Sequence, residues 1–292
     1  MSENNKKVPS RTAEDATLIR MGESRKPEGE RICYDPLAIH FISQETLELL
    51  QKNPEMDKEK EIIFRGVANT IAARVRYFDD FVKKSIDDGI EQLVILGAGY
   101  DTRAYRIEGL KENVKVFEVD HPGTQGVKIE KINEIFGSLP GYVEYVSVDF
   151  EIEPLDHKLL NRGYSDSKKT LFVMEGLTHY IPPKAVIRIL SFIVKNSSKG
   201  SAVIFDYGSI PANIDENQDL DVAENIGKSL DESGEQVQFA LKEGTVKKFL
   251  SKRGFSNIKD VTSKDYKKAY FHGKNKDREV YSLISFAHAV VE

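Results

Sequence analysis

The chain has 292 residues, and its 42 Lys and Arg against 47 Asp and Glu give a formal net charge of −5. Hydrophobic residues make up 40% of the sequence, enough for a substantial core, so a wholly disordered chain is excluded. The acidic balance argues against a dedicated nucleic-acid binder, because phosphate binding usually shows as a basic excess. With Cys33 as its single cysteine, the chain has no intrachain disulfide and no cysteine-rich zinc site.

The sequence carries neither a predicted secretory signal nor a predicted membrane span. Residues 1–10 are polar and charged, which predicts a disordered tail, and they contain no apolar segment of the kind that a secretory signal needs. No run of about 18 apolar residues occurs anywhere in the chain, so no membrane span is expected. We therefore expect a cytoplasmic protein without a membrane partner.

Helices are predicted ahead of the first strand. A polar start predicts a helix over residues 12–22, and Asp35-Pro36 predicts the entry of a second helix. Residues 58–84 carry apolar side chains at spacings of three and four and predict one long helix. We interpret residues 11–90 as an N-terminal helical cap.

From residue 91 the pattern changes to short apolar runs that alternate with helical segments. Strands are predicted over 93–96, 114–119, 142–148, 171–174 and 201–205, and helices over 123–136 and 183–196. This alternation is typical of an α/β protein with a parallel sheet and helices on both faces. Residues 91–208 are therefore interpreted as the core of the fold.

Two further segments follow this core. Residues 209–243 break the alternation and are rich in Asp and Glu, so we interpret them as a lid or substrate insert. A solvated pair of helices without contact to the substrate is the alternative for this insert. Residues 244–292 form the C-terminal part of the core, with a predicted helix over 244–252 and predicted strands over 255–261 and 279–287.

The most informative segment is LVILGAGYDTRAYR, residues 93–106. Gly97 permits a tight turn out of a strand, and Gly99 removes a side chain where a ligand must come close. The start of the next helix offers free N–H groups to a polar ligand. A dinucleotide fingerprint needs a third glycine where this sequence has Thr102, so the turn instead resembles that of S-adenosylmethionine-dependent methyltransferases. A plain strand-to-helix turn is the alternative.

Three carboxylates follow predicted strands, at the edge where ligands bind in open α/β sheets. Asp120 comes about 20 residues after the glycines, where a carboxylate accepts ribose hydroxyls or caps the next helix. Asp149 either accepts from an adenine amine or forms a turn. Glu175 follows four apolar residues and needs a cationic partner there, for which a ligand ammonium would serve.

Taken together, these segments resemble the leucine carboxyl methyltransferase family over nearly the whole chain. The motifs ARVRYFDDF, LGAGYDTRAYR, FEVDHP, VSVDFE and MEGLTHYIP occur in the order of that family. The resemblance implies a Rossmann-like class I methyltransferase, with a seven-stranded, mostly parallel sheet whose last strand is antiparallel. It also implies S-adenosyl-L-methionine as the cofactor, bound to the core between the N-terminal cap and the lid. No catalytic metal is expected, because the histidines lack ligand spacing.

The resemblance assigns roles along the cofactor. Arg74 would bind the methionyl carboxylate through its guanidinium group, and Arg20 would join it. The turn at Gly97 and Gly99 would hold the methionyl amino end, whose charge Glu175 would neutralise. Asp120 would bind the ribose, and Asp149 and the backbone of Phe150 would bind the adenine.

Several residues near the predicted strand ends are candidates for the methyl-acceptor side: Tyr180, Tyr207 and Arg103, together with Tyr100 and His179. Arg103 would attract a carboxylate acceptor or have a structural role in its motif. His179 would act as a general base or simply pack in the structure. A carboxylate is ionised at neutral pH and needs no base, whereas a phenol, with a pKa of about 10, benefits from one.

We therefore expect a methyltransferase that transfers a methyl group from S-adenosylmethionine to a carboxylate or hydroxyl oxygen by in-line displacement. The acceptor is expected to be a small molecule or a peptide and not a nucleic acid. Two alternatives are a non-catalytic protein that binds the same cofactor and a nicotinamide-dependent oxidoreductase, against which the missing third glycine speaks.

Overall fold

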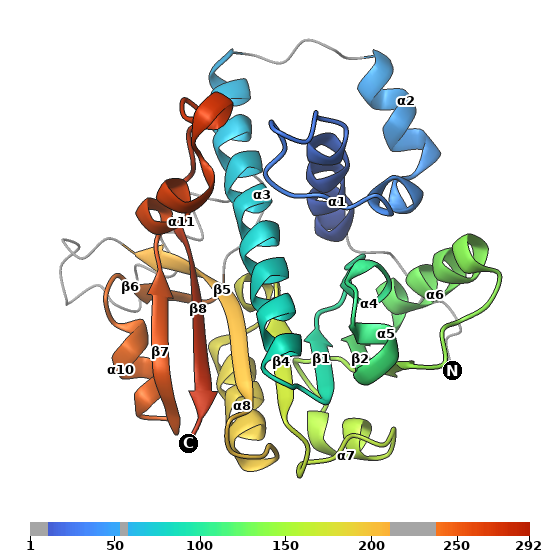
Figure 1. Cartoon of the computed structure of the whole chain (residues 1–292), viewed down its shortest axis with the longest axis vertical. Helices are drawn as coiled ribbons and strands as arrows, with labels where there is room; N and C mark the ends of the chain where they lie inside the picture. The colour runs from blue at the N-terminus through green and yellow to red at the C-terminus, as the bar shows by residue number, and fades with distance from the viewer. Residues whose placement is uncertain (1–10, 53–57, 211–237) are drawn as a thin grey trace.

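The computed structural model describes residues 11–52, 58–210 and 238–292. The strands are β1 (Gln92–Leu96), β2 (Lys115–Asp120), β3 (Val143–Ser147), β4 (Thr170–Met174), β5 (Ala202–Ile210), β6 (Ala240–Lys242), β7 (Phe255–Val261) and β8 (Ile284–Val291). They form one sheet in the order β3-β2-β1-β4-β5-β8-β7, and the short β6 pairs with β5 (Figure 1). Strands β1 to β5 run parallel, whereas β8 is antiparallel to β5 and β7. The mostly parallel α/β sheet is confirmed, with β6 as an eighth strand.

Helices cover both faces of this sheet (Figure 1). They are α1 (Arg11–Ser24), α2 (Gln44–Lys52), α3 (Lys58–Asp87), α4 (Arg103–Arg106), α5 (Leu110–Asn113), α6 (Pro122–Phe136), α7 (Leu155–Leu160), α8 (Pro183–Lys195), α10 (Val246–Ser251) and α11 (Ser263–Tyr270), with 3₁₀ turns η1 (Ala38–Phe41), η2 (Thr178–Tyr180) and η4 (Gly273–Asn275). No helix within these described ranges is long and apolar enough to cross a lipid bilayer.

The central strands are buried on both faces, which explains their unbroken apolar runs. Val94 and Leu96 of β1 face a core formed with α7, α8 and α10. Leu93 and Ile95 face the opposite core, which α3, α4 and α5 cover. Because successive strand residues point to opposite faces, a strand between two helical layers needs apolar residues at every position.

The second N-terminal helix differs from its prediction. The residues after Pro36 form the 3₁₀ turn η1 and then a separate helix, α2. Ser43 Oγ accepts the backbone N–H of Thr46 (3.1 Å), and this capping bond starts α2 as a new helix. The long helix over 58–84 is confirmed as α3, and the helix over 12–22 as α1.

The last strand begins later than predicted, at residue 284 instead of 279. The backbone just before it bonds to side chains of α3: the carbonyl of Glu279 accepts from Asn69 Nδ2 (2.6 Å), and the N–H of Tyr281 donates to Thr70 Oγ1 (2.7 Å). These bonds satisfy the backbone without strand pairing. Helix α11, which a capping box at Thr262 begins, was not predicted because its sequence is mostly polar.

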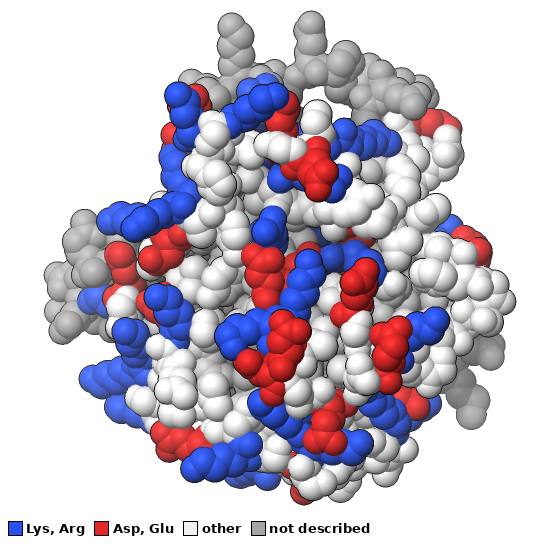
Figure 2. Space-filling model, in the orientation of Figure 1, with Lys and Arg blue, Asp and Glu red and all other residues white. Residues whose placement is uncertain are grey.

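The tail at residues 1–10 and most of the predicted lid over 209–243 lie outside the described residues. The lid, and with it the division of the chain into cap, core and insert, stays a prediction. On the face drawn in Figure 2, basic and acidic side chains are interspersed and do not gather into one basic patch.

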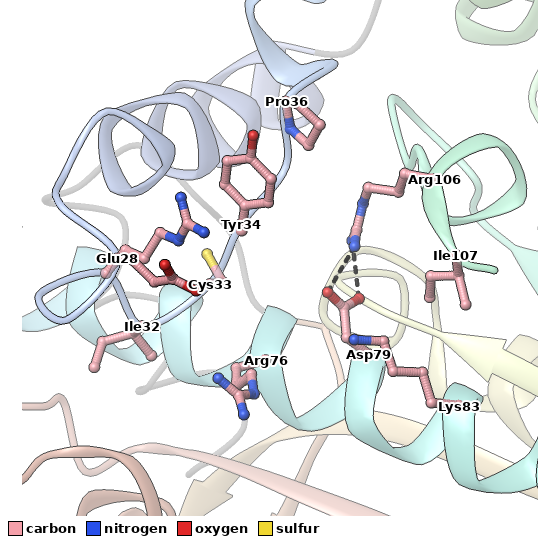
Figure 3. A pocket seen from close by; sticks show the side chains of 11 residues that line it. Glu28, Ile32, Cys33, Tyr34, Pro36, Arg76, Asp79, Lys83, Arg106 and Ile107 are labelled. Carbon is pink, nitrogen blue, oxygen red and sulfur yellow. Dashed lines mark hydrogen bonds and ion pairs between the residues drawn. The ribbon is translucent and has the colours of Figure 1, made fainter.

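A pocket of about 350 Å³ lies between the segment that follows α1, the middle of α3 and the end of α4 (Figure 3). Its wall includes the buried Cys33, and burial raises the pKa of this thiol to about 12. The thiol is therefore protonated at neutral pH and is a poor nucleophile. Asp79 and Arg106 also line the pocket, and Asp79 belongs to the ion network described next.

Candidate functional site

The turn after β1 depends on both of its glycines. Gly97 has a φ of +68°, and a Cβ there would lie 2.9 Å from the side chain of Leu177. Gly99 has a φ of +43°, and its Cβ would come within 3.4 Å of Ala13 in α1. Left-handed backbone and close neighbours both favour glycine here. The near neighbours of this turn are thus the loop after β4 and the first N-terminal helix.

Asp120 ends β2 with its carboxylate held against this turn. One oxygen accepts the N–H of Gly99 and the other accepts the N–H of His121 (2.6 Å). Burial raises the pKa of Asp120, and the two N–H groups oppose that shift. The side chain is therefore fixed beside the glycine turn at the edge where β1 and β2 end.

The loop after β3 places Asp149 and Phe150 at the same edge of the sheet. Asp149 is half-buried, and its Oδ1 accepts the N–H of Glu151 (3.0 Å), as in a turn. Phe150 is buried, and its carbonyl accepts from Nη2 of Arg188 (2.9 Å). Within the described chain, the N–H of Phe150 has no acceptor, so it is free to bind a ligand.

A buried chain of alternating charges lies where β4 and β5 meet α3. Arg74 of α3 donates from Nε to Oε1 of Glu175 (3.1 Å) and from Nη1 to Oδ2 of Asp206 (2.7 Å). Arg103 lies on the other side of Glu175, with 2.6 Å between its Nη1 and Oε2. The protein itself therefore supplies two cationic partners for Glu175, Arg74 and Arg103.

Opposite charges keep this network ionised despite its burial. Burial opposes charge on both Arg74 and Asp206, but their mutual attraction outweighs it, so the pKa of Arg74 is raised and that of Asp206 is lowered. Nη2 of Arg74 donates to no protein atom in the described ranges. Arg74 therefore keeps one charged donor for a ligand.

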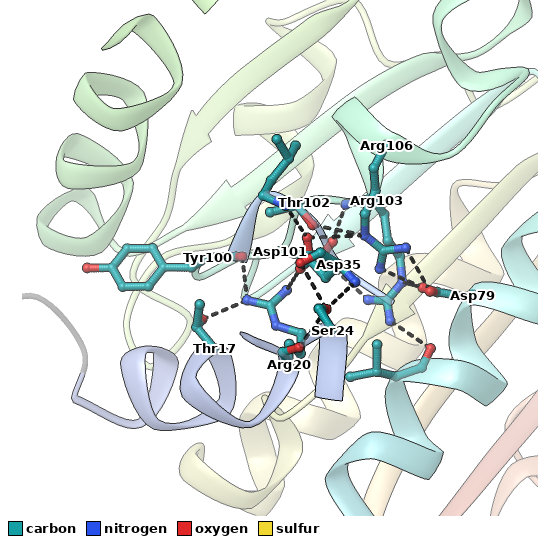
Figure 4. Close-up of polar contacts among 12 residues, drawn as sticks. Thr17, Arg20, Ser24, Asp35, Asp79, Tyr100, Asp101, Thr102, Arg103 and Arg106 are labelled. Carbon is teal, nitrogen blue, oxygen red and sulfur yellow. Dashed lines mark hydrogen bonds and ion pairs between the residues drawn. The ribbon is translucent and has the colours of Figure 1, made fainter. Parts of the chain in front are cut away.

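Arg103 is 2% exposed, and each of its side-chain nitrogens contacts a protein oxygen. Besides Glu175, it bonds to Oδ1 of Asp79 (2.7 Å), Oδ2 of Asp101 (2.6 Å) and the carbonyl of Val75 (3.2 Å) (Figure 4). Burial opposes the ionisation of Asp101, but Arg103 and Lys128 lower its pKa to about 2. Four of the five N–H groups of Arg103 are therefore used within the protein, and its role on the acceptor side stays a prediction.

Arg20 belongs to a separate cluster that joins α1 to the turn after β1 (Figure 4). Its Nη2 donates to Oγ1 of Thr17 (2.6 Å) and to the carbonyl of Tyr100 (2.7 Å), and its Nη1 lies 3.0 Å from Asp35. Arg20 and Arg74 are both described, and no contact joins them. The structure thus shows Arg20 positioning α1, and its role in cofactor binding stays a prediction.

Tyr207 is an acceptor candidate that the structure places elsewhere. It is 1% exposed, belongs to the core with α8 and α10, and donates its hydroxyl to Asp260 (2.7 Å). Its neighbour Asp206 points to the opposite face of β5, toward α3. Because side chains alternate along a strand, Tyr207 faces away from the ion network, and we correct its assignment to a packing residue.

His179 and Tyr180 remain next to the site, in η2 just after Glu175. Nε2 of His179 lies 3.2 Å from Oδ2 of Asp206, and the Tyr180 ring meets the His179 ring edge to face at 6.2 Å. Asp206 also accepts the N–H of Gly176 (2.7 Å). One carboxylate therefore holds Arg74, the loop after β4 and His179 together.

Asp206 is the residue of this network that the sequence analysis missed. The available signal was a carboxylate inside the apolar strand AVIFDYG, where burial is costly without a cationic partner. Within the described ranges, no group of three His, Cys, Asp or Glu side chains is arranged to hold a metal ion.

Known proteins are similar to this chain over most of its length. The model of the leucine carboxyl methyltransferase family matches residues 13–194. A Bacillus subtilis (strain 168) protein, provisionally named the S-adenosyl-L-methionine-dependent methyltransferase YktD, is 28% identical over 260 residues, which cover 86% of this chain and 82% of that protein. A Mycobacterium avium (strain 104) protein with a similar provisional name is 31% identical over 199 residues, 66% of this chain and 65% of its own.

A solved structure supports the fold independently. A DUF574 family protein from Streptomyces avermitilis aligns over 98% of this chain and 99% of its own, with a TM-score of 0.58 and 12% sequence identity. At this identity the match concerns the fold alone.

Proposed function

Because the chain belongs to the leucine carboxyl methyltransferase family and is an S-adenosyl-L-methionine-dependent methyltransferase, we propose that it methylates a carboxylate or hydroxyl oxygen. The acceptor in this proposal is a small molecule or a peptide and not a nucleic acid. The observation that supports the proposal is the set of charged and hydrogen-bonding groups beside the glycine turn. Membership in this family also argues against the two alternatives, a nicotinamide-dependent oxidoreductase and a non-catalytic protein that binds the same cofactor.

The groups at the ends of the parallel strands fit the chemistry of the cofactor at both of its ends. Nη2 of Arg74 is a free charged donor suited to the methionyl carboxylate, and Glu175 supplies negative charge for the ammonium group. Asp120 offers acceptors suited to ribose hydroxyls. The unpaired N–H of Phe150 suits an adenine nitrogen. We assign these four residues to cofactor binding, together with Gly97, Gly99 and Asp149.

We assign positioning roles to two arginines. Arg103 holds the carboxylate of Glu175 from the side opposite Arg74, so the acid keeps one orientation at the end of β4. Arg20 holds α1 against the carbonyl of Tyr100 and thereby closes one wall of the site. Both act through protein groups and not on the reacting atoms.

In-line methyl transfer requires the protein mainly to position the acceptor oxygen and the methyl group. When bound, the cofactor supplies an electrophilic methyl group for in-line displacement by the acceptor oxygen. The side chains must hold that oxygen about 3 Å from the methyl carbon and exclude water. Tyr180, the last residue of η2 in the loop that follows β4, is our candidate for the acceptor wall.

A labelled methyl group tests O-methylation directly. The purified chain is incubated with S-adenosylmethionine carrying a trideuterated methyl group and with mixtures of carboxylic acids, phenols and amines. Mass spectrometry of the products should show the label on oxygen, as methyl esters that mild base cleaves or as methyl ethers that it leaves intact. Label found only on nitrogen or carbon would overturn the proposal.

A further inference from the structure

We infer that His179, oriented by Asp206, is the general base of this enzyme and that its acceptor is therefore a hydroxyl group with the acidity of a phenol. This inference rests on the proposed O-methylation and narrows it to one acceptor class. Its ground is the contact between two buried side chains, His179 of η2 and Asp206 of β5, beside the residues assigned to the methionyl end of the cofactor.

The imidazole ring of His179 is held in one orientation. Its side chain is 9% exposed, and Nε2 lies 3.2 Å from the fully buried carboxylate of Asp206. Asp206 is itself fixed by Arg74 (2.7 Å) and by the N–H of Gly176 (2.7 Å), and its own carbonyl accepts the hydroxyl of Thr178. An anchored carboxylate of this kind selects the tautomer with the proton on Nε2.

That tautomer leaves the lone pair on Nδ1, and Nδ1 has no partner in the described part of the chain. Nδ1 is also not sealed inside the protein. Among the described residues, the enclosed side-chain atoms that make no hydrogen bond belong to Arg20, Asp35, Glu118 and Glu175, and several of these are in ion pairs; Nδ1 of His179 is not one of them. Nδ1 of His179 thus keeps access to a ligand or water, as a base must.

Two acids and one arginine lie around the His179 ring. Asp206 faces it from β5, and Glu175 precedes it in the same loop, with Arg74 of α3 between the two acids. The phenol of Tyr180 is the remaining titratable neighbour. The negative charge of Asp206 stabilises the imidazolium that forms, without taking its proton.

The reaction balances with these groups. The acceptor hydroxyl passes its proton to Nδ1, and the oxygen forms a bond to the methyl carbon. The carbon–sulfur bond breaks, and its electron pair stays on sulfur, which becomes a neutral thioether. The imidazolium then releases its proton to solvent. A carboxylate acceptor, already ionised, would make this base superfluous.

The first test needs no acceptor. Two-dimensional ¹⁵N spectra of the histidine-labelled chain report the protonated nitrogen of each ring, and the His179→Gln variant assigns the signal. When the ring is neutral, we expect its proton on Nε2. A neutral ring with its proton on Nδ1 would overturn the inference.

The second test uses two groups of probe acceptors, phenols such as catechol and carboxylic acids such as benzoic acid. We expect methyl ethers from the phenols, with the rate at pH 7 reduced about 100-fold or more in His179→Gln and partly recovered at higher pH, where the phenol ionises by itself. His157→Gln, the same change at an exposed histidine of α7, should leave the rate unchanged.

The outcomes separate this inference from the proposed function. Methyl esters formed equally fast by the wild type and by His179→Gln would leave O-methylation standing and refute the base. Calorimetry should find the same affinity for S-adenosylhomocysteine in both proteins. A large loss of that affinity would mean that His179 supports the cofactor site, and it would equally refute the inference.

Discussion

Replacing Asp206 with Asn should destabilise the protein strongly, because Asp206 is the shared acceptor of a buried ion network. The change keeps the side-chain size and leaves an oxygen for the N–H of Gly176, but it removes the negative charge next to Arg74. Breaking a buried ion pair costs about 3–5 kcal/mol. Since Glu175 still contacts Arg74 at 3.1 Å, we expect a loss of about 3 kcal/mol, at the lower end of that range.

The dependence of this loss on pH gives the prediction a second signature. Burial alone would raise the pKa of Asp206, but Arg74 and His179 lower it below its ordinary value. A lowered folded pKa contributes stability that is complete above the unfolded pKa of about 3.9 and is lost as the pH falls toward the folded value. The difference between wild type and Asp206→Asn should therefore shrink below about pH 4.

Urea unfolding of both proteins at pH 7, 5 and 3.5 measures these differences. The matched control is Asp80→Asn, which removes the same charge from an exposed i,i+4 pair with Arg76 and should cost less than about 1 kcal/mol. Equal losses for Asp206→Asn and Asp80→Asn would show that the buried network does not stabilise the fold, and the reasoning would fail.

Three further changes test the site and its corrections. Asp120→Ala should weaken S-adenosylmethionine binding by about 1–3 kcal/mol through lost hydrogen bonds, and unchanged calorimetric affinity would contradict the ribose assignment. Gly97→Ala should cost more in unfolding experiments than Gly137→Ala, because both have positive φ but only the first places its Cβ 2.9 Å from another side chain; equal costs would exclude the clash. Tyr207→Phe should lower the free energy of unfolding by about 1 kcal/mol and leave the rate of methyl transfer unchanged. A slower reaction would indicate that Tyr207 contacts the methyl acceptor.

Local signals predicted most of the framework. The strands β1 and β4 are recognisable because both of their faces are buried, and the glycines of the first turn are recognisable because a left-handed backbone excludes most other residues. The predictions failed where the deciding interaction is distant along the chain. The start of β8 is one such case, since Asn69 and Thr70 in α3 bind the residues just ahead of it.

Sequence alone predicted the carboxyl ends of the strands as the ligand-binding edge, because unbroken apolar runs and glycine chemistry are properties of short segments. The sequence also indicated that Glu175 needs a cation beside it, but it did not show which of the 42 Lys and Arg residues supplies that charge. Tertiary packing decided that Arg74 and Arg103 flank this acid and that Asp206, 132 positions after Arg74, completes the network. The physical reason is that a buried charge must be neutralised by whichever opposite charge the fold brings within a few ångströms, and sequence distance carries no information about that partner.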